Sequence, residues 1–227
     1  MSSTTPTPPP SSLTERRKAE TRMEIARAAA GLFVRHGLRA TRAEDIAQAA
    51  GIAPRTFYRY FATKEEAVAP LYAAGAQRWV EAVRAAPAGT GVLRALEEGV
   101  RHTLTPGLGV SASSWEWVRT LLRLAEANPS LRRVWAEVCQ TSERLLGEAL
   151  TELVTRAGAP GRPPRPDGAD NVAAGPRARF AAAVASAAVR TALEAWAEGD
   201  GPVEGPDGPA ELALRNLAAL REFPWGA

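Results

Sequence analysis

The sequence predicts an all-α protein in two parts, a short N-terminal three-helix unit and a longer helical bundle. Three observations lead to this prediction. Apolar residues recur at three- and four-residue spacing through almost the whole chain, as on the buried face of a helix. No segment shows sustained β-type alternation. Residues 41–44 and 63–66 also have the form of capping boxes, which begin helices.

Composition places the chain among globular proteins and excludes several classes. Of 227 residues, 45% are hydrophobic and 23% are charged, which is enough to build a core. The single cysteine, Cys139, excludes a disulfide framework and a cysteine-based zinc site, and it fits a reducing cytoplasm. No apolar run is long enough to cross a membrane. Residues 1–12 are rich in Ser, Thr and Pro and lack the features of a signal peptide, so we expect a disordered tail on a cytoplasmic protein.

The first three helices can be placed from periodicity and from their end signals. Apolar spacing predicts a first helix over about residues 13–36, which ends at Gly37. The capping box at 41–44 begins a short second helix, with Glu44 reaching back to the first turn. Gly51 ends that helix because glycine accepts a left-handed conformation, and Pro54 suits the first turn of the third helix.

The remaining helices follow by the same criteria. The second capping box begins a helix that reaches about residue 86, and helical spacing resumes over 93–104 and from Ser113. Asn128 and Pro129 have the form of a cap and a first-turn proline for a long helix to about residue 154. The Gly- and Pro-rich segment 159–176 has little to bury, so a flexible loop is expected there. Two last helices are predicted, over 180–197 and 209–223.

Signals of catalysis and of metal binding are weak. His36 and His102 lie far apart, and the sequence has no zinc-protease motif, phosphate-binding loop, dinucleotide fingerprint or nucleophile elbow. Cys139 lies near the apolar stripe of the long helix and is best interpreted as a small core residue. We therefore expect no catalytic residue, no metal and no cofactor. A helical enzyme with a buried acid–base pair is the weakest alternative.

The distribution of charge and a helix-turn-helix point to DNA. Residues 13–64 carry eleven basic and five acidic side chains, a net charge of +6 against +3 for the whole chain. Two short helices joined through residues 50–52 form a helix-turn-helix, whose second helix has the width of the major groove. Phe57 and Phe61 should face the core, which leaves Arg55 free to form paired hydrogen bonds with a guanine. A helical hairpin without any partner is the structural alternative.

The same residues carry a family resemblance. The run Ala28…Leu32-Phe33…Gly37…Ala40-Thr41…Asp45-Ile46-Ala47…Ala50-Gly51-Ile52…Thr56-Phe57-Tyr58-Arg59-Tyr60-Phe61…Lys64-Glu65-Glu66 resembles the DNA-binding domain of TetR/AcrR bacterial regulators. The resemblance covers residues 25–71 and implies DNA contacts from Thr41, Arg42, Arg55, Thr56, Tyr58, Tyr60 and Lys64. The chain departs from the family pattern twice. Ala53 stands where a serine N-cap is usual, and Arg42 stands where a threonine is frequent.

The resemblance also implies a role for residues 65–227, which would bind an effector and dimerise. Residues 189–201 are weakly similar to a subgroup that binds acyl-CoA-like ligands. We expect Trp117, Leu121, Trp135 and Val138 to line an apolar pocket between residues 71 and 154, away from the DNA-binding part, with Trp79 and Trp115 nearby. Plain core filling by these aromatic residues is the alternative. An anionic ligand would also need an arginine at the mouth, and the candidates are Arg78, Arg119, Arg123, Arg132 and Arg133.

Together these inferences predict a homodimeric transcriptional repressor. It would bind a palindromic operator and be released by a small apolar or acyl-CoA-like effector. The dimer should form through helices at 129–156 and 177–197, so that a charge at Ala188 would give monomers. The alternative is a helical ligand-binding protein that makes no contact with DNA.

Overall fold

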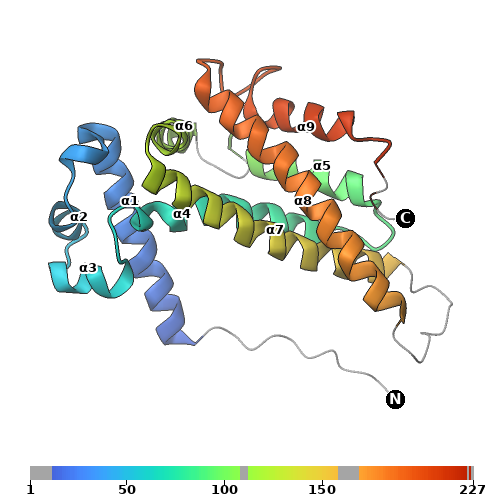
Figure 1. The fold of residues 1–227 in the computed structure, drawn as a ribbon, viewed down its shortest axis with the longest axis horizontal. Helices are drawn as coiled ribbons and strands as arrows, with labels where there is room; N and C mark the ends of the chain where they lie inside the picture. The colour runs from blue at the N-terminus through green and yellow to red at the C-terminus, as the bar shows by residue number, and fades with distance from the viewer. Residues whose placement is uncertain (1–11, 108–111, 158–168, 224, 226–227) are drawn as a thin grey trace.

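The described part of the chain contains helices and no strand. A computed structural model describes residues 12–107, 112–157, 169–223 and Trp225, and the all-α prediction is confirmed over these residues (Figure 1). The α-helices are α1 (Leu13–Ala40), α2 (Ala43–Ala49), α3 (Pro54–Tyr60), α4 (Ala69–Arg84), α5 (Val92–Leu104), α6 (Ala112–Ala127), α7 (Pro129–Ala157), α8 (Ala169–Glu198) and α9 (Pro209–Ala219), and a single 3₁₀ turn, η1 (Glu66–Val68), precedes α4.

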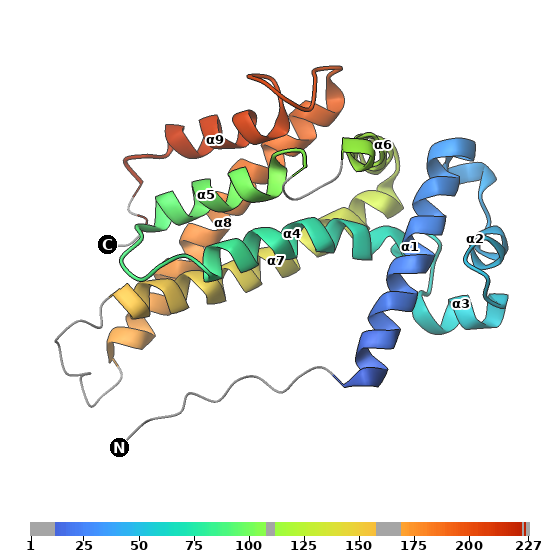
Figure 2. The ribbon, with the colours of Figure 1, turned by 180° about the vertical axis from the view of Figure 1, so that it is seen from behind.

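Helices α1 to α3 form a small unit at one end of an elongated helical body (Figure 1). The body has α7 and α8 on one side and α4 and α5 on the other, as the view from behind shows (Figure 2). Helix α1 packs against both α4 and α6, so it joins the small unit to the body. A change in the position of α4 or α6 therefore acts on α1 directly.

The N-terminal unit is held together by one apolar core. Ile25 and Phe33 of α1, Ile46 of α2 and Phe57 of α3 are all at most 1% exposed. Burying four such side chains contributes on the order of 1.5–3 kcal/mol each, which stabilises helices too short to persist alone. The first helix was predicted to end at Gly37, but it only kinks there, with φ of +79°, and helical structure resumes after the kink to Ala40.

The second helix begins one residue later than its predicted capping box. Thr41 is 2% exposed, and its hydroxyl donates back to the Gly37 carbonyl over 2.9 Å instead of capping α2. Arg42 is the N-cap residue, and the Asp45 carboxylate accepts from its backbone N–H over 2.8 Å. Asp45 therefore has the role predicted for Glu44, because Thr41 completes the kink at Gly37.

Other end signals agree with the sequence prediction. Gly51 has φ of +68° in the turn between α2 and α3, and Pro54 is the first residue of α3. The Thr63 hydroxyl accepts from the Glu66 N–H over 3.3 Å, where η1 begins. The Asn128 side chain accepts from two amides at the start of α7.

The loop predicted over 159–176 is wrong in its C-terminal part, which is helical. Helix α8 begins at Ala169 and contains Pro176, whereas residues 159–168 and the expected tail at 1–11 lie outside the described residues. Pro176 has no N–H to donate to a helical hydrogen bond, so the sequence analysis placed it outside the helix. The turns after Pro176 are held against α7 by buried alanines at 178, 181, 182 and 185. At the other end of the chain, Ser12, which was expected in the disordered tail, is the N-cap of α1. Within the described residues, no helix is long and apolar enough to span a membrane.

Candidate nucleic-acid interface and ligand cavity

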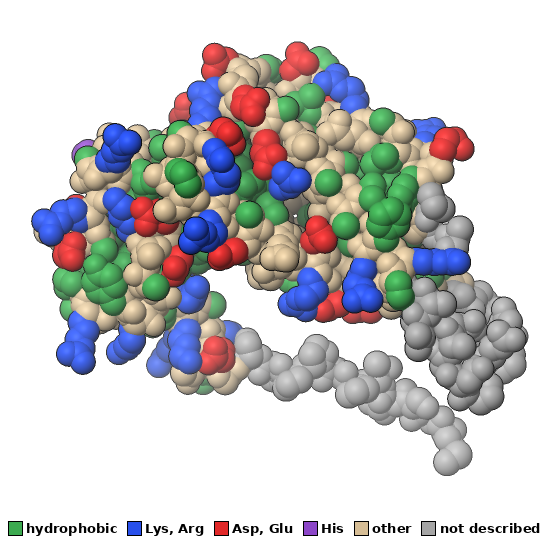
Figure 3. Space-filling view, viewed as in Figure 1, with side chains coloured by type: hydrophobic (Ala, Val, Ile, Leu, Met, Phe, Trp, Pro, Cys, Tyr) green, Lys and Arg blue, Asp and Glu red, His purple; other side chains and the backbone are tan. Residues whose placement is uncertain are grey.

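The outer face of α3 carries exposed cations and hydroxyls. Arg55 and Arg59 are exposed, Tyr58 is 52% exposed, and Thr56 and Tyr60 are half-buried. Lys and Arg side chains gather along the edge of the molecule where α3 and the start of α1 lie (Figure 3). Phe57 faces the opposite way, into the core. Helix α3 thus presents one polar face to solvent, with the dimensions and charge that suit a major groove.

Helix α3 begins without a side-chain cap, and the Thr56 and Phe57 amides both donate to the Ala53 carbonyl. Ala53 makes no side-chain cap, as its departure from the family pattern predicts, and Pro54 occupies the first helical position. Arg42 lies close to this face at the start of α2, with a side chain that is 77% exposed and 3.7 Å from Glu44. The Tyr58 hydroxyl is 3.5 Å from the same glutamate. Glu44 therefore lies near two residues that the resemblance assigns to DNA contacts.

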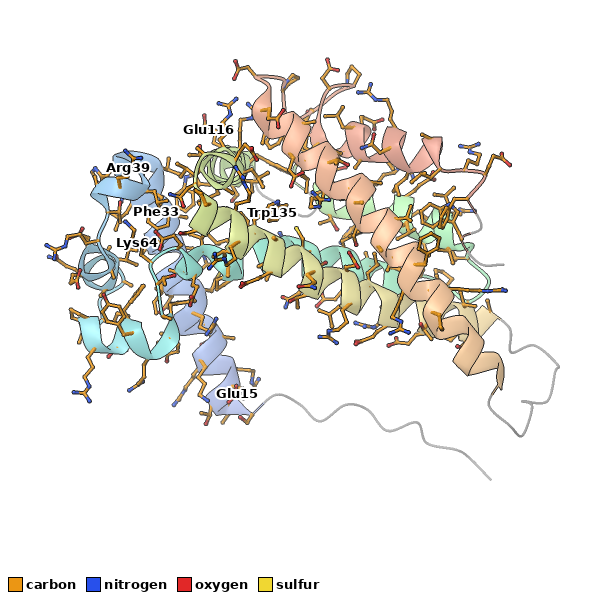
Figure 4. The ribbon with its side chains drawn as sticks, in the orientation of Figure 1. Glu15, Phe33, Arg39, Lys64, Glu116 and Trp135 are labelled. Carbon is orange, nitrogen blue, oxygen red and sulfur yellow. The ribbon has the colours of Figure 1, made fainter. Side chains whose placement is uncertain are left out.

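Two of the residues that the resemblance assigns to DNA are engaged inside the protein. The Lys64 ammonium donates to the carbonyl of Leu38 over 2.7 Å and to that of Thr41 over 2.8 Å. These bonds tie the segment before α4, where Figure 4 labels Lys64, to the end of α1 after its kink at Gly37. The Thr41 hydroxyl is buried, as described above. In this structure both residues stabilise the N-terminal unit instead of facing the exposed surface of α3.

A cavity of about 620 Å³ lies in the helical body. All four residues expected in an effector pocket, Trp117, Leu121, Trp135 and Val138, are in its wall, together with Trp79 and Trp115. The ring centroids of Tyr72 and Trp135 are 5.0 Å apart, and the Tyr72 hydroxyl donates to the Leu121 carbonyl over 2.9 Å. Burial raises the pKa of Tyr72, so it remains a neutral donor. The tryptophans border a space of a size typical of ligand pockets, although Trp79 and Trp115 are themselves buried in the core.

The cavity extends beyond the limits expected from the sequence. Met23 and Arg27 of α1 form part of its wall, so it is not remote from the DNA-binding part. Helix α8 contributes Ser186 and Arg190 from its expected dimer segment. Sequence reasoning missed Tyr72 and Ser186 because isolated polar residues on apolar helices give no pattern that indicates which space they face.

The five candidate arginines for the mouth separate into different roles. Arg78 lines the cavity. Arg119 and Arg123 bind carbonyls between Ala197 and Gly201, which attaches α6 to the end of α8. Arg132 pairs with Glu126, and Arg133 lies along an outer groove that adjoins the cavity.

Trp135 lies between the cavity and that outer groove and contributes to the walls of both (Figure 4). Its indole N–H donates to Glu194 over 2.8 Å, and Arg190 pairs with the same carboxylate at 3.1 Å. Cys139 also borders both spaces, and burial raises the pKa of its thiol to about 12. The Cys139 thiol is therefore protonated at neutral pH. Separately, the described residues contain no group of three or more side chains that could hold a metal ion.

Comparison with known proteins agrees with this arrangement. The family model described as bacterial regulatory proteins, tetR family, matches residues 25–69. The chain is 32% identical over 161 residues to the HTH-type transcriptional regulator TcmR of Streptomyces glaucescens, an alignment that covers 69% of each protein.

Solved structures show the same fold. The TetR family repressor AlkX from Dietzia sp. superposes with a TM-score of 0.56 at 19% identity and covers 88% of this chain and 95% of its own. A regulator from Mesorhizobium loti gives a TM-score of 0.51 at 18% identity, with 89% and 96% covered. With its helix-turn-helix, its helical body and its relation to TcmR, this chain belongs to the TetR family and is a DNA-binding transcriptional regulator, not an enzyme.

Proposed function

We propose that this regulator is a repressor that binds a palindromic operator as a homodimer and leaves it when an effector fills the cavity. Residues 13–64 would form the DNA-binding domain and residues 65–227 the effector-binding and dimerisation domain. The observation that carries this proposal is the shared cavity wall, in which α1 of the DNA-binding domain lies beside α4, α6, α7 and α8. A ligand there contacts both parts of the protein at once.

The DNA contacts would come from the exposed face of α3 and from Arg42. Arg55 would read a base through two hydrogen bonds to guanine, while Thr56, Tyr58 and Tyr60 would set the register on phosphates. Lys64 and Thr41 support this face indirectly through the bonds that they make inside the domain. Two copies of α3 in a dimer would enter major grooves about 34–36 Å apart.

The dimer face would be the outer surface of α7 and α8. Phe180 is 62% exposed on α8, and Ala187 and Thr191 are exposed further along the same helix. Small residues allow a second helix to approach closely. Ala188 is a poorer site for a disruptive charge than the sequence suggested. It is 9% exposed, and its carbonyl accepts from Asn216 of α9, so it faces its own protomer.

An effector would act by changing the position of α1. Trp117 of α6 lines the cavity and also lies over Gly31 of α1, where a Cβ on that glycine would be 3.7 Å from its ring. A ligand that displaces Trp117 therefore moves the surface on which α1 rests. The spacing of the two α3 helices would then no longer match the operator, which couples the two sites energetically.

Operator binding tests the proposal. An inverted repeat from the DNA beside the coding region is labelled, and binding is followed by fluorescence anisotropy over a series of salt concentrations. We expect a dimer to bind, with affinity that falls steeply as salt rises. Arg55→Ala should cost about 1–3 kcal/mol and relax the preference at one base pair. The proposal fails if the repeat binds no better than random DNA of equal length, or if Arg55→Ala weakens both equally.

A further inference from the structure

Arg22 of α1 binds the C-terminal end of α3. Its guanidinium donates to the Tyr60 carbonyl over 3.1 Å, and the central carbon of the guanidinium lies 4.6 Å from the centre of the Phe61 ring. Tyr60 is the last residue of α3, and Phe61 is its C-cap and is only 3% exposed. Arg22 thus makes a hydrogen bond and a cation–π contact at the point where α3 ends beside α1 (Figures 1 and 2).

A cation at this position has a physical advantage. The last carbonyls of a helix have no partner within the helix, and partial negative charge collects there. A guanidinium supplies both a donor and the favourable charge, and attraction to the ring face adds to both. Helix α3 has only seven residues, which is too short for a stable helix on its own, so contacts at its ends determine how firmly it is held.

The N-terminal end of α3 has no comparable contact. Ala53, which precedes the helix, has no side chain that can cap it, and the Thr56 and Phe57 amides share the Ala53 carbonyl. Helix α2 packs most closely against α3. Within the described residues, the bond from Arg22 is the only side-chain hydrogen bond that joins α1 to α3. The polar attachment of α3 to α1 is therefore at its C-terminal end.

This attachment matters more for reading bases than for binding phosphates. Arg55, Thr56 and Tyr58 all precede Tyr60 on the same short helix, so a tilt at its C-terminal end displaces them together. Hydrogen bonds to base edges weaken steeply with distance and angle. Attraction to phosphates acts over a longer range and tolerates a displaced helix.

We propose that Arg22 is a positioning residue for operator recognition. It fixes the C-terminal end of α3, and with it the tilt of that helix in the major groove, and it compensates for the side-chain cap that Ala53 does not provide. Arg22 acts through α3 and not by contact with a base. This inference rests on the proposed operator binding and adds a residue of α1, outside the two helices of the helix-turn-helix, that sets the sequence preference.

Three variants of the full-length protein separate the contact from the charge. Arg22→Met removes the donor and the charge, whereas Arg22→Lys keeps both. Arg17 is exposed on the same helix and has no hydrogen bond or ion pair among the described residues, so Arg17→Met removes a charge without the contact. Fluorescence anisotropy measures the affinity of each variant for the operator and for random DNA of equal length.

We expect Arg22→Met to lower the affinity for the operator about tenfold and that for random DNA no more than about twofold. Arg22→Lys should keep most of the operator preference, and Arg17→Met should keep all of it. The preference is a ratio measured within one variant, so a partial loss of folded protein lowers both affinities and cannot imitate the result.

A direct phosphate contact by Arg22 would give a different result. Arg22→Met would then weaken operator and random DNA by the same factor, and the slope of log affinity against log salt would become shallower by about one. That outcome, or a wild-type operator preference in Arg22→Met, overturns the proposal.

Hydrogen exchange locates the effect within the N-terminal unit. The Phe61 amide donates to the Phe57 carbonyl at the end of α3, and the Ala50 amide donates to the Ile46 carbonyl at the end of α2. Arg22→Met should accelerate exchange at Phe61 and leave Ala50 unchanged. Equal acceleration at both amides would mean that Arg22 stabilises the whole unit, which contradicts a specific hold on α3.

The compensation is tested by giving α3 the missing cap. In an Ala53→Ser background, Arg22→Met should reduce the operator preference only about threefold, because the capped helix depends less on its other end. An equal loss in both backgrounds would show that the two ends are independent.

The two proposals can fail separately. If the wild-type protein does not prefer the operator to random DNA, the proposed operator binding is wrong, and exchange at Phe61 still tests the hold on α3. If the wild type prefers the operator and Arg22→Met does so equally, only the role of Arg22 is wrong.

Discussion

At the scale of single residues, Thr103 is the clearest case in which the ligand-free protein is not at its most stable. Its hydroxyl is buried without a partner among the described residues, and valine has nearly the same shape. Thr103→Val should therefore raise the free energy of unfolding by about 1 kcal/mol, because it removes an unsatisfied donor. For a chain of this length that corresponds to a melting temperature about 2–4 °C higher.

Differential scanning calorimetry without ligand measures this effect, and Thr151→Val is the matched control. The Thr151 hydroxyl donates to the Gly147 carbonyl over 2.8 Å, so its removal should bring no gain. Equal changes in the two variants would show that Thr103 has a partner in solution.

Lys64 makes contacts inside the protein that its place in the motif did not indicate. The sequence implied a phosphate contact, whereas the ammonium binds two carbonyls of the protein. Lys64→Met should lower the free energy of unfolding by about 1–3 kcal/mol, because it leaves both carbonyls without their charged donor.

The other lysine of the chain provides the comparison. Lys18 is 55% exposed and pairs with Glu15 on α1, so Lys18→Met should change stability by no more than about 0.5 kcal/mol. Urea denaturation compares the two variants. If Lys64→Met keeps wild-type stability and only makes the salt dependence of operator binding shallower, the phosphate role is correct.

At the scale of helices, the sequence predicted most of the elements because their end signals are local. Gly51, Pro54 and Asn128 each act within one turn of the chain and have their predicted roles, whereas Gly37 kinks α1 without ending it. The start of α8 was missed because Pro176 looked like a break, and the turns after it are fixed by contacts with α7, more than twenty residues earlier in sequence.

Helix α6 is attached to the end of α8 by two arginines. Arg123 donates to the Gly199 carbonyl over 2.8 Å and to Asp200 over 2.7 Å, while Arg119 lies 4.1 Å from the Trp196 ring centre. Because α6 also packs on α1, this attachment connects the N-terminal three-helix unit, the cavity wall and α8, the helix proposed for the dimer interface. Movement of α6 cannot leave α8 unaffected.

This attachment should weaken in acid. The hydrogen bond from Arg123 holds the pKa of Asp200 below its ordinary value, so its contribution is complete above the unfolded pKa near 4 and is lost as the pH falls through the lower folded value. Asp200→Asn should therefore be less stable than wild type at pH 7, and the difference should be smaller at about pH 3, which is below the unfolded pKa near 4. Urea denaturation at both pH values measures this. An equal difference at both would mean that charge is not what joins the helices.

At the scale of the whole molecule, the sequence predicted the fold class, the family and four residues that lie in the wall of the cavity. It could not show that α1 and α8 complete that wall, because contacts between helices far apart in sequence leave no periodic signal. Nor could it show which alanines of α8 face the solvent. Small residues cover several sides of that helix, so only packing distinguishes Ala187 from Ala188.

The proposed dimer face can be tested by placing a charge at Ala187, which is exposed, and comparing it with a charge at Ala188, which is buried. Ala187 is exposed on α8, so Ala187→Glu should leave the protomer folded and place two like charges against each other across a two-fold interface. We expect monomers by light scattering, an unchanged helical circular dichroism spectrum, and operator affinity lower by at least about tenfold, because each half-site then binds alone. Ala218→Glu, on an exposed position of α9, should remain dimeric. Ala188→Glu should instead lower the melting temperature, since its side chain faces its own protomer. A dimeric Ala187→Glu variant with wild-type operator affinity would place the interface away from this part of α8.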